Sequence, residues 1–537
     1  MQKYLLLFGT TLVATVVIIP LLALVWMSFG EAGVWQHLVE TVLGEYVRNS
    51  LMLMIGVATG TLILGVSAAY AVSMWEFPCR RVLGWSLLLP LAMPTYITAY
   101  AYTGLLDIAG PVQSLIRDQF SLSFGEYWFP EIRSISGAVI VFSLVLYPYI
   151  YLLVCAVLNR QSPNLRDSAR LLGLSRRQTF WKLTLPLIRP AIVAGLALAL
   201  METLADFGAV SYFGINTFTT GIYRTWNGLG SASSAAQLSL ILLTFIIVLL
   251  VMEKTSRRRA SYADAKLNPI EHRRKISGTM IPVVLLLLFC PILFGFVIPA
   301  TQLAMWAVKT MDPLGWSGYY ELVWNSISVA LVTAGLAALM TLIVLYTNRV
   351  VSSKYTAFMR FFVGLGYAVP GIVIAVATLI PLAYFDNQLD NFMRSNFDFS
   401  SGLLLSGSLF ALILAYLVRF LTVSLNTIEP NLQRIPHSLD MTTRSLGLSA
   451  FGVLHRVHLP LIRPGMAAAM LMVFVEVMKE LPATLVLRPF NFNTLAVRAY
   501  ELASDERLPE AAMASLTIVL VGLLPVVLLM RLVNEAR

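Results

Sequence analysis

Long, almost uncharged hydrophobic runs alternate with short polar segments along the whole chain. A helix needs about 20 residues to cross the roughly 30 Å of hydrocarbon in a bilayer. Runs of that length lie near 4–28, 50–75, 82–106, 136–158, 190–211 and 235–252, and again near 279–307, 323–347, 361–384, 402–427, 464–487 and 511–531. The pattern predicts an all-α membrane protein with twelve transmembrane helices, six in each half.

The basic residues lie mostly between these runs and indicate an orientation. An even number of spans places both termini on the same side of the membrane. If that side is the cytoplasm, the inside segments hold roughly three times as many Lys and Arg residues as the outside segments, as the positive-inside rule requires. We therefore expect a multi-pass membrane protein with both termini cytoplasmic.

The second half of the chain repeats the first at a spacing of 274 or 276 residues. The matching pairs include Asn49 and Asn325, Gly173 and Gly447, Pro186 and Pro460, Glu202 and Glu476, and Arg224 and Arg498. Six spans per half give two repeats of parallel topology, with a solute path expected at their interface. We predict a first transmembrane repeat over 1–252, a basic cytoplasmic linker over 253–278 and a second repeat over 279–537.

Composition agrees with a bilayer environment. Hydrophobic residues make up 58% of the chain and charged residues 12%, with a mean hydropathy of +0.78, whereas soluble domains carry roughly a quarter charged residues. The net charge of +10 resides in the segments between spans, so it predicts orientation and not nucleic-acid binding. Cys79, Cys155 and Cys290 stand alone, without the spacing of a disulfide framework or metal site.

A motif recurs in the loop between the fourth and fifth spans of each half. The first copy reads DSARLLG over 167–173 and LTLP over 183–186, and the second reads MTTRSLG over 441–447 and VHLP over 457–460. Helix-forming residues precede a glycine that permits a sharp turn, and an amphipathic stretch follows that we expect the proline to end. Each loop is predicted to form a short helix-turn-helix outside the membrane. The second copy has Met441 in place of Asp167, and its nearest acid, Asp440, is displaced by one position.

Two carboxylates four residues apart lie in the fifth span of each half. The pairs are Glu202 with Asp206, and Glu476 with Glu480. On a helix this spacing places both on one face, and acidic groups in hydrocarbon usually face a bundle interior or a water-filled path and find partners. Two interpretations stay open: the carboxylates line a path for a cation, or they tie helices together, with Lys479 as one partner. The deeper Glu202 and Glu476 favour structural pairing, and Asp206 and Glu480 favour the mouth of the path.

The remaining chemistry-bearing residues do not predict catalysis. No glycine-rich phosphate loop ending in Lys-Ser or Lys-Thr is present, so a nucleotide-hydrolysing site has to come from another chain. None of the five histidines lies in a span; His455 and His458 fall in the second copy of the repeated loop, where we expect solvated or interfacial side chains and no metal site. Arg224 and Arg498, in matching outer loops, either contact a protein partner outside the membrane or anchor the chain at lipid headgroups.

The repeated loop resembles the E-A-A-x-x-x-G-x9-I-x-L-P loop of binding-protein-dependent ABC importer permeases. The stretches KELPAT over 479–484 and LRPF over 487–490 make nearly the whole chain similar to the fused permease of bacterial ferric-iron ABC importers. This resemblance implies the type I ABC importer permease fold and a docking role for Asp167, Ala169, Gly173, Leu183, Pro186, Gly447, Val457 and Pro460. It also implies two copies of an ATP-binding subunit that hold the ATP and Mg, a periplasmic ferric-iron-binding protein, and transport by alternating access.

Other functions remain open on the residues alone. The same machinery could carry thiamine, a polyamine, a phosphonate or sulfate, and although intramembrane carboxylates disfavour an anion, only the resemblance selects iron. An ion-coupled secondary transporter predicts uptake without an ATPase, and the paired docking loops argue against it. A membrane scaffold leaves the repeated intramembrane acids without a purpose.

Overall fold

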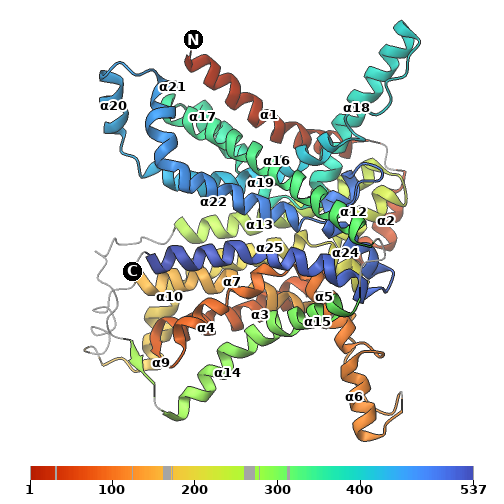
Figure 1. Cartoon of the computed structure of the whole chain (residues 1–537), viewed down its shortest axis with the longest axis vertical. Helices are drawn as coiled ribbons and strands as arrows, with labels where there is room; N and C mark the ends of the chain where they lie inside the picture. Colours follow the sequence, from red (N-terminus) through yellow and green to blue (C-terminus); the bar gives the residue numbers. More distant parts are fainter. Residues whose placement is uncertain are drawn as a thin grey trace. The chain divides into compact units, whose positions relative to one another are not determined.

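The computed structural model describes residues 2–30, 33–123, 125–160, 171, 173–258, 273–276, 278–310 and 315–535, and these are almost all helical (Figure 1). Among them, eleven helices are long and apolar enough to cross a membrane. The number rises to twelve if the bent pair Arg80–Ala92 and Thr95–Phe120 forms one span. The described chain is therefore the all-α, multi-span protein that the hydrophobic runs predict.

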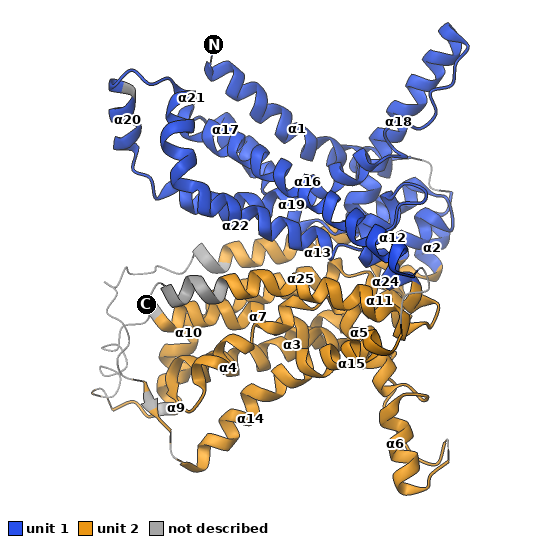
Figure 2. Ribbon diagram, in the orientation of Figure 1, with its two compact units in different colours: residues 1–40, 221–241, 312–501 blue, residues 41–220, 242–311, 502–537 orange. Residues whose placement is uncertain are grey.

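The chain folds into two compact units (Figure 2). Unit 1 comprises Met1–Glu40, Gly221–Ile241 and Asp312–Glu501, and unit 2 comprises Thr41–Thr220, Leu242–Met311 and Leu502–Arg537. Each unit thus combines most of one sequence half with helices from the other half. The division into two repeats and a linker describes the sequence and stays a prediction, and most of the linker, 259–272, lies outside the described residues.

Unit 1 is built on three packed helices: α16 (Gly315–Val350), α19 (Leu409–Gln433) and α22 (Leu459–Met478) contact one another. The N-terminal helix α1 (Gln2–Ser28) packs on α16 and on three further helices of this unit. The other helices of the unit are α2 (Trp35–Thr41), α17 (Lys354–Val363), α18 (Gly371–Phe397), α20 (His437–Ser445), α21 (Ala450–Val453), α23 (Pro482–Leu487) and α24 (Leu495–Ser504).

Unit 2 has the same central arrangement, in which α3 (Leu43–Met74), α7 (Ile135–Arg160) and α10 (Leu185–Ala205) contact one another. From the second half come α14 (Ile281–Ile292), α15 (Ile298–Lys309) and α25 (Leu508–Glu535), and α15 packs on α25. The unit also holds α4 (Arg80–Ser86), α5 (Thr95–Leu106), α6 (Pro111–Phe120), α9 (Arg176–Thr179) and α11 (Gly208–Tyr212). Among the described helices, α12 (Phe218–Asn227) and α13 (Ala232–Arg258) contribute several residues to each unit, and the last residues of α2 and α24 also fall in unit 2.

A short parallel strand pair belongs to unit 2. Strand β1 (Trp75–Glu76) follows α3 directly, and β2 (Arg274–Lys275) lies at the end of the predicted linker. The pairing joins Trp75 to Arg274 and Glu76 to Lys275. It therefore fixes the end of the linker against the end of α3.

Small residues allow α3 and α7 to approach closely. Gly56 and Gly60 are spaced as G-x-x-x-G on α3. A Cβ at Gly56 would lie 2.5 Å from a methyl carbon of Val139, and one at Gly60 would overlap Ser143. Close backbone approach of this kind drives helix association in membranes, where apolar surface alone gives little preference for protein over lipid.

The third span of each half is interrupted at a proline, which corrects the prediction of continuous helices over 82–106 and 361–384. In unit 2 a 3-10 turn ends at Ala92 and α5 starts after Pro94, so that the two parts of the span meet at 93°. In unit 1 a 3-10 turn ends at Ala368 and α18 starts after Pro370. Both prolines have φ −57° and ψ 144°. The reason is local, because a residue that precedes proline is driven out of the helical region.

Candidate functional site

The repeated acidic residues lie at the ends of α10 and α22. Glu202 and Glu476 occupy the last turns of these helices and are partly buried. Glu476 forms an ion pair with Lys479, with 2.9 Å between Oε1 and Nζ, and both side chains are 23% exposed. The pairing with Lys479 that the sequence suggests is therefore present in the second half.

Asp206 and Glu480 lie beyond the helix ends and do not continue the helical face. Asp206 has φ −68° and ψ 134°, and α22 ends at Met478. The carboxylate of Asp206 accepts hydrogen bonds from the backbone N–H groups of Ala209 and Val210, at 2.9 and 3.3 Å. The expectation that each pair shares one helix face is wrong here, because the second carboxylate of the pair turns to cap the short helix that follows.

Glu480 repeats this capping arrangement in unit 1. Its oxygens accept from the N–H groups of Ala483 and Thr484 at 3.2 and 3.3 Å. The helix that it caps, α23, is the counterpart of α11, which Asp206 caps. The capping role is thus a shared property of both halves.

The two capping carboxylates differ in their long-range partners. Thr95 donates its hydroxyl to Asp206 at 2.5 Å, whereas Arg419 forms an ion pair with Glu480 at 3.2 Å. Among the described residues, no Lys, Arg or His side chain forms an ion pair with Asp206. Neither partner is among the residues that the sequence pattern singles out, although Arg419 is a lone charge inside the predicted span 402–427, and a charge isolated in hydrocarbon signals a buried partner.

The docking loops have the turns that their glycines predict. Gly173 has φ +74° and Gly447 has φ +83°, in the left-handed region that glycine enters most easily. Asp167 and Ala169 lie outside the described residues. The structure therefore places the glycine end of the first motif and the whole of the second.

Both loops join the next span through a π-helical turn and not through a break. The turns cover Phe180–Thr184, which contains Leu183, and Leu454–His458, which contains Val457. Pro186 and Pro460 then fall in the first turn of α10 and α22. The expectation that these prolines end the amphipathic stretch is wrong, because the helix continues through them.

The π turns have a physical cause in the prolines that follow them. A proline in an α-helix lacks the N–H donor and its ring clashes with the carbonyl four residues earlier. Here the residue before Pro186, Leu185, donates to the carbonyl of Phe180, five residues back, and the widened turn relieves the clash. A third π turn, Leu293–Val297, also stands just before an Ile-Pro pair, at Ile298 and Pro299.

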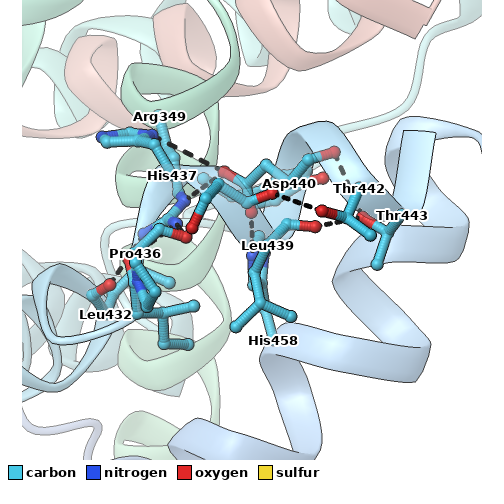
Figure 3. Close-up of polar contacts among 12 residues, drawn as sticks. Arg349, Leu432, Pro436, His437, Leu439, Asp440, Thr442, Thr443 and His458 are labelled. Carbon is cyan, nitrogen blue, oxygen red and sulfur yellow. Dashed lines mark hydrogen bonds and ion pairs between the residues drawn. The ribbon is translucent and has the colours of Figure 1, made fainter. Parts of the chain in front are cut away.

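A charged network connects the second docking loop to the end of α16 (Figure 3). Asp440, on α20, accepts from Arg349 at 2.7 Å and forms a 2.7 Å hydrogen bond with His458. Burial alone would raise the pKa of Asp440, but the hydrogen bonds from Arg349 and His458 outweigh it and hold that pKa below its usual range. His458 is 1% exposed, which corrects the expectation of a solvated ring, whereas His455 is exposed.

The outer arginines occupy equivalent helices. Arg224 lies on α12 and is exposed, and Arg498 lies on α24 and is partly buried. Within the described part of the chain, no group of three His, Cys, Asp or Glu side chains is arranged to hold a metal ion.

A helical fold with many spans, an internal repeat and a loop motif present once in each half together define an integral membrane protein of repeated architecture. The model of the family "binding-protein-dependent transport system inner membrane component" matches the chain twice, at residues 61–261 and 341–536. The chain belongs to this family, in the form that joins two permease copies in one polypeptide.

Relatives of two lengths are similar to the chain. The Fe(3+)-transport system permease protein of Haemophilus influenzae is 27% identical over 504 residues, covering 91% of this chain and 90% of that protein. The ferric transport system permease protein of Actinobacillus pleuropneumoniae is 22% identical over 498 residues, covering 88% and 69%. The molybdenum transport system permease protein of Escherichia coli is 28% identical over 210 residues, covering 37% of this chain but 89% of its own length. A half-length permease thus matches part of a fused one.

Proposed function

We propose that this chain is the permease subunit of an ABC importer that moves ferric iron, delivered by a periplasmic binding protein, across the inner membrane by alternating access. The observation that carries the cargo assignment is the similarity to the Fe(3+) permease over about nine-tenths of both chains. Both termini are cytoplasmic in this proposal, and the ATP and Mg belong to a separate subunit.

Exposed apolar side chains on the two loops support docking of that ATP-binding subunit. Leu171 is 89% exposed in the first loop, and Met441 and Leu446 are 73% and 77% exposed in the second. Exposed apolar groups outside the spans are typical of surfaces that bind a partner. Two loops of like geometry predict two copies of the ATP-binding subunit.

The contacts of the acidic residues refine the proposed path. Glu476 and Glu480 have cationic partners in Lys479 and Arg419, so their negative charge is largely balanced. Asp206 is held by a hydroxyl and backbone groups. We therefore place a cation-attracting position at Asp206, near Glu202, in the first half.

The test is uptake of radiolabelled ferric iron into proteoliposomes that contain this chain, its ATP-binding subunit and a loaded binding protein. We expect saturable, ATP-dependent uptake that Gly173→Pro combined with Gly447→Pro abolishes. Thiamine, putrescine and molybdate serve as competitors. Uptake of one of these without iron uptake would contradict the cargo, and uptake without the ATP-binding subunit would indicate a secondary transporter.

The outer arginines have a separate test. Reversing charge at Arg224 and Arg498 together should weaken binding of the periplasmic protein to the reconstituted permease at low salt, since complementary charge mainly steers association. Unchanged affinity and association rate would leave these residues as headgroup anchors.

A further inference from the structure

The second docking loop contains a polar cluster that neither the docking motif nor the solute path explains. Its centre is Asp440, which stands one position before the residue where the motif has its acid, Met441. The motif position itself points to solvent, since Met441 is 73% exposed, whereas the Asp440 side chain is 13% exposed. The acid of this loop is thus turned toward its own chain and away from a partner.

Each carboxylate oxygen of Asp440 binds a different element (Figure 3). Oδ2 accepts from Nε of Arg349, in the last turn of α16, at 2.7 Å. Oδ1 lies 2.7 Å from Nε2 of His458, at the end of the π turn that leads into α22. One side chain on α20 therefore connects the docking helix to two of the three central helices of unit 1.

Arg349 extends the connection to the third central helix, α19. Its Nη1 donates to the carbonyl of Leu432 at 2.8 Å, and its Nη2 donates to the carbonyl of Ile435 at 2.8 Å. Carbonyls at a helix C-terminus lack partners within the helix, and a guanidinium can satisfy several of them at once. The same group therefore fixes the end of α19 and the start of the link to α20.

The cluster is buried, so each of its charged side chains depends on the others for charge compensation and hydrogen bonds. The side chains of Arg349 and His458 are 6% and 1% exposed. The ring of Tyr346 packs edge-on against that of His458, with centroids 5.6 Å apart, and its hydroxyl donates to the carbonyl of Ala450 on α21. Removing one partner of a buried ion pair leaves the other charged group without compensation.

The sequence of the first half does not repeat these three residues. Positions 276 residues before Arg349 and 274 residues before Asp440 and His458 are Ser73, Arg166 and Thr184. An arginine cannot accept a hydrogen bond, so Arg166 cannot replace the carboxylate. Ser73 instead donates to the sulfur of Cys155 at 3.5 Å. The residues that form this cluster in the second half are therefore specific to that half.

We propose that Arg349, Asp440 and His458 form a clamp that holds α20, the helix of the second docking loop, rigidly to the central helices of unit 1 and so makes this loop a stiff coupling to an ATP-binding subunit. This proposal rests on the function proposed above for its coupling role, but the attachment itself does not. In the clamp, Asp440 is a positioning residue that acts through Arg349 and His458 and does not contact the ATP-binding subunit or the solute.

The attachment is tested first, on the full chain alone in nanodiscs, by hydrogen exchange. Asp440→Ala should raise the exchange rate of amides over 437–446 at least tenfold, and Asp440→Asn, which keeps an acceptor oxygen, should raise it less. Exchange in α10 and over 173–184 should not change. Arg434→Ala is the matched control, because Arg434 is an exposed arginine beside the clamp whose only described hydrogen bonds are those of its backbone N–H. Unchanged exchange over 437–446 in Asp440→Ala would overturn the clamp.

The coupling role is tested second, in the complete transporter. Asp440→Ala should lower the solute imported per ATP hydrolysed several-fold while the ATP-binding subunits still copurify. Faster amide exchange over 437–446 with an unchanged amount of solute imported per ATP hydrolysed would overturn the mechanical role and leave the clamp in place. Faster exchange with no ATP-binding subunit bound to the wild-type chain would instead contradict the proposed function, so the two failures are distinguishable.

Discussion

Arg419 and Glu480 form an ion pair at 3.2 Å in which the carboxylate side chain is only 2% exposed. The same carboxylate caps α23, so it joins α19 to the helix that follows α22. Asp206 has the same capping role in unit 2 but binds a threonine in place of an arginine. This difference allows the charge and the cap to be separated experimentally.

Glu480→Gln should lower the free energy of unfolding by about 3–5 kcal/mol, because it leaves the buried guanidinium of Arg419 without its negative partner while keeping an oxygen that can accept the capping hydrogen bonds. Asp206→Asn should cost about 1 kcal/mol, since the amide oxygen can still accept and no cation loses its partner. Thermal unfolding in nanodiscs measures both. Equal losses would show that Arg419 gains little from Glu480.

Glu476 and Lys479 allow a test between structural pairing and a role on the path. Glu476→Gln alone should reduce iron uptake several-fold, because it removes the negative charge that pairs with Lys479. Combining it with Lys479→Met should restore uptake, with little change in stability, since the pair is partly exposed and contributes about 1 kcal/mol or less. If the double variant transports as poorly as the single one, the Glu476 carboxylate itself acts on the solute.

Gly447→Ala should destabilise the second docking loop by about 1–2 kcal/mol, since a left-handed backbone disfavours any residue with a Cβ. The cost is purely conformational, because a Cβ at Gly447 would meet no atom within 4 Å. Binding of the ATP-binding subunit should weaken in parallel, as measured by copurification. Gly452→Ala on α21 is the control: its Cβ would make only ordinary contacts, and it should be neutral or stabilising.

The ion pair of Arg133 and Glu506, in unit 2, should make a pH-dependent contribution to the free energy of unfolding. Arg133 donates to both carboxylate oxygens of Glu506, at 2.6 and 2.7 Å, and this holds the pKa of Glu506 below its ordinary value. A lowered folded-state pKa contributes stability above the unfolded pKa of about 4.3, and that contribution is lost as pH falls through the folded value.

Glu506→Gln should therefore lower the free energy of unfolding at pH 7, and the unfolding temperature with it. The loss should be less than about 1 kcal/mol, because the Glu506 side chain is 59% exposed. The difference from wild type should shrink toward pH 3. Asp505→Asn, an exposed neighbour, is the control. A difference that stays constant with pH would contradict an electrostatic origin.

The sequence predicts the spans and loops well because those features depend on local composition. Hydrophobic length predicts where helices cross, and the glycines at 173 and 447 predict turns that the structure confirms. The sequence also contains a local signal for the interruptions at Pro94 and Pro370, because each proline follows an apolar residue, Met93 or Val369, within a span. The continuous hydrophobicity of these runs nevertheless predicts unbroken helices. The π turns before Pro186 and Pro460 could not be predicted in this way, because proline marks both helix ends and helices that adapt to it.

The sequence by itself predicted a membrane protein of about twelve spans whose second half repeats the first, with a loop motif present in both halves. These predictions follow from the hydrophobicity of each segment and from matching residues at a constant offset along the chain. Only the tertiary structure decided which partner each charged group has. Thr95 and Asp206 are 111 residues apart, Arg349 and Asp440 are 91 apart, and Arg419 and Glu480 are 61 apart. In a low-dielectric interior an unpaired charged group is costly, so it binds the partner that lies nearest. Which partner is nearest depends on how the helices pack in the folded chain.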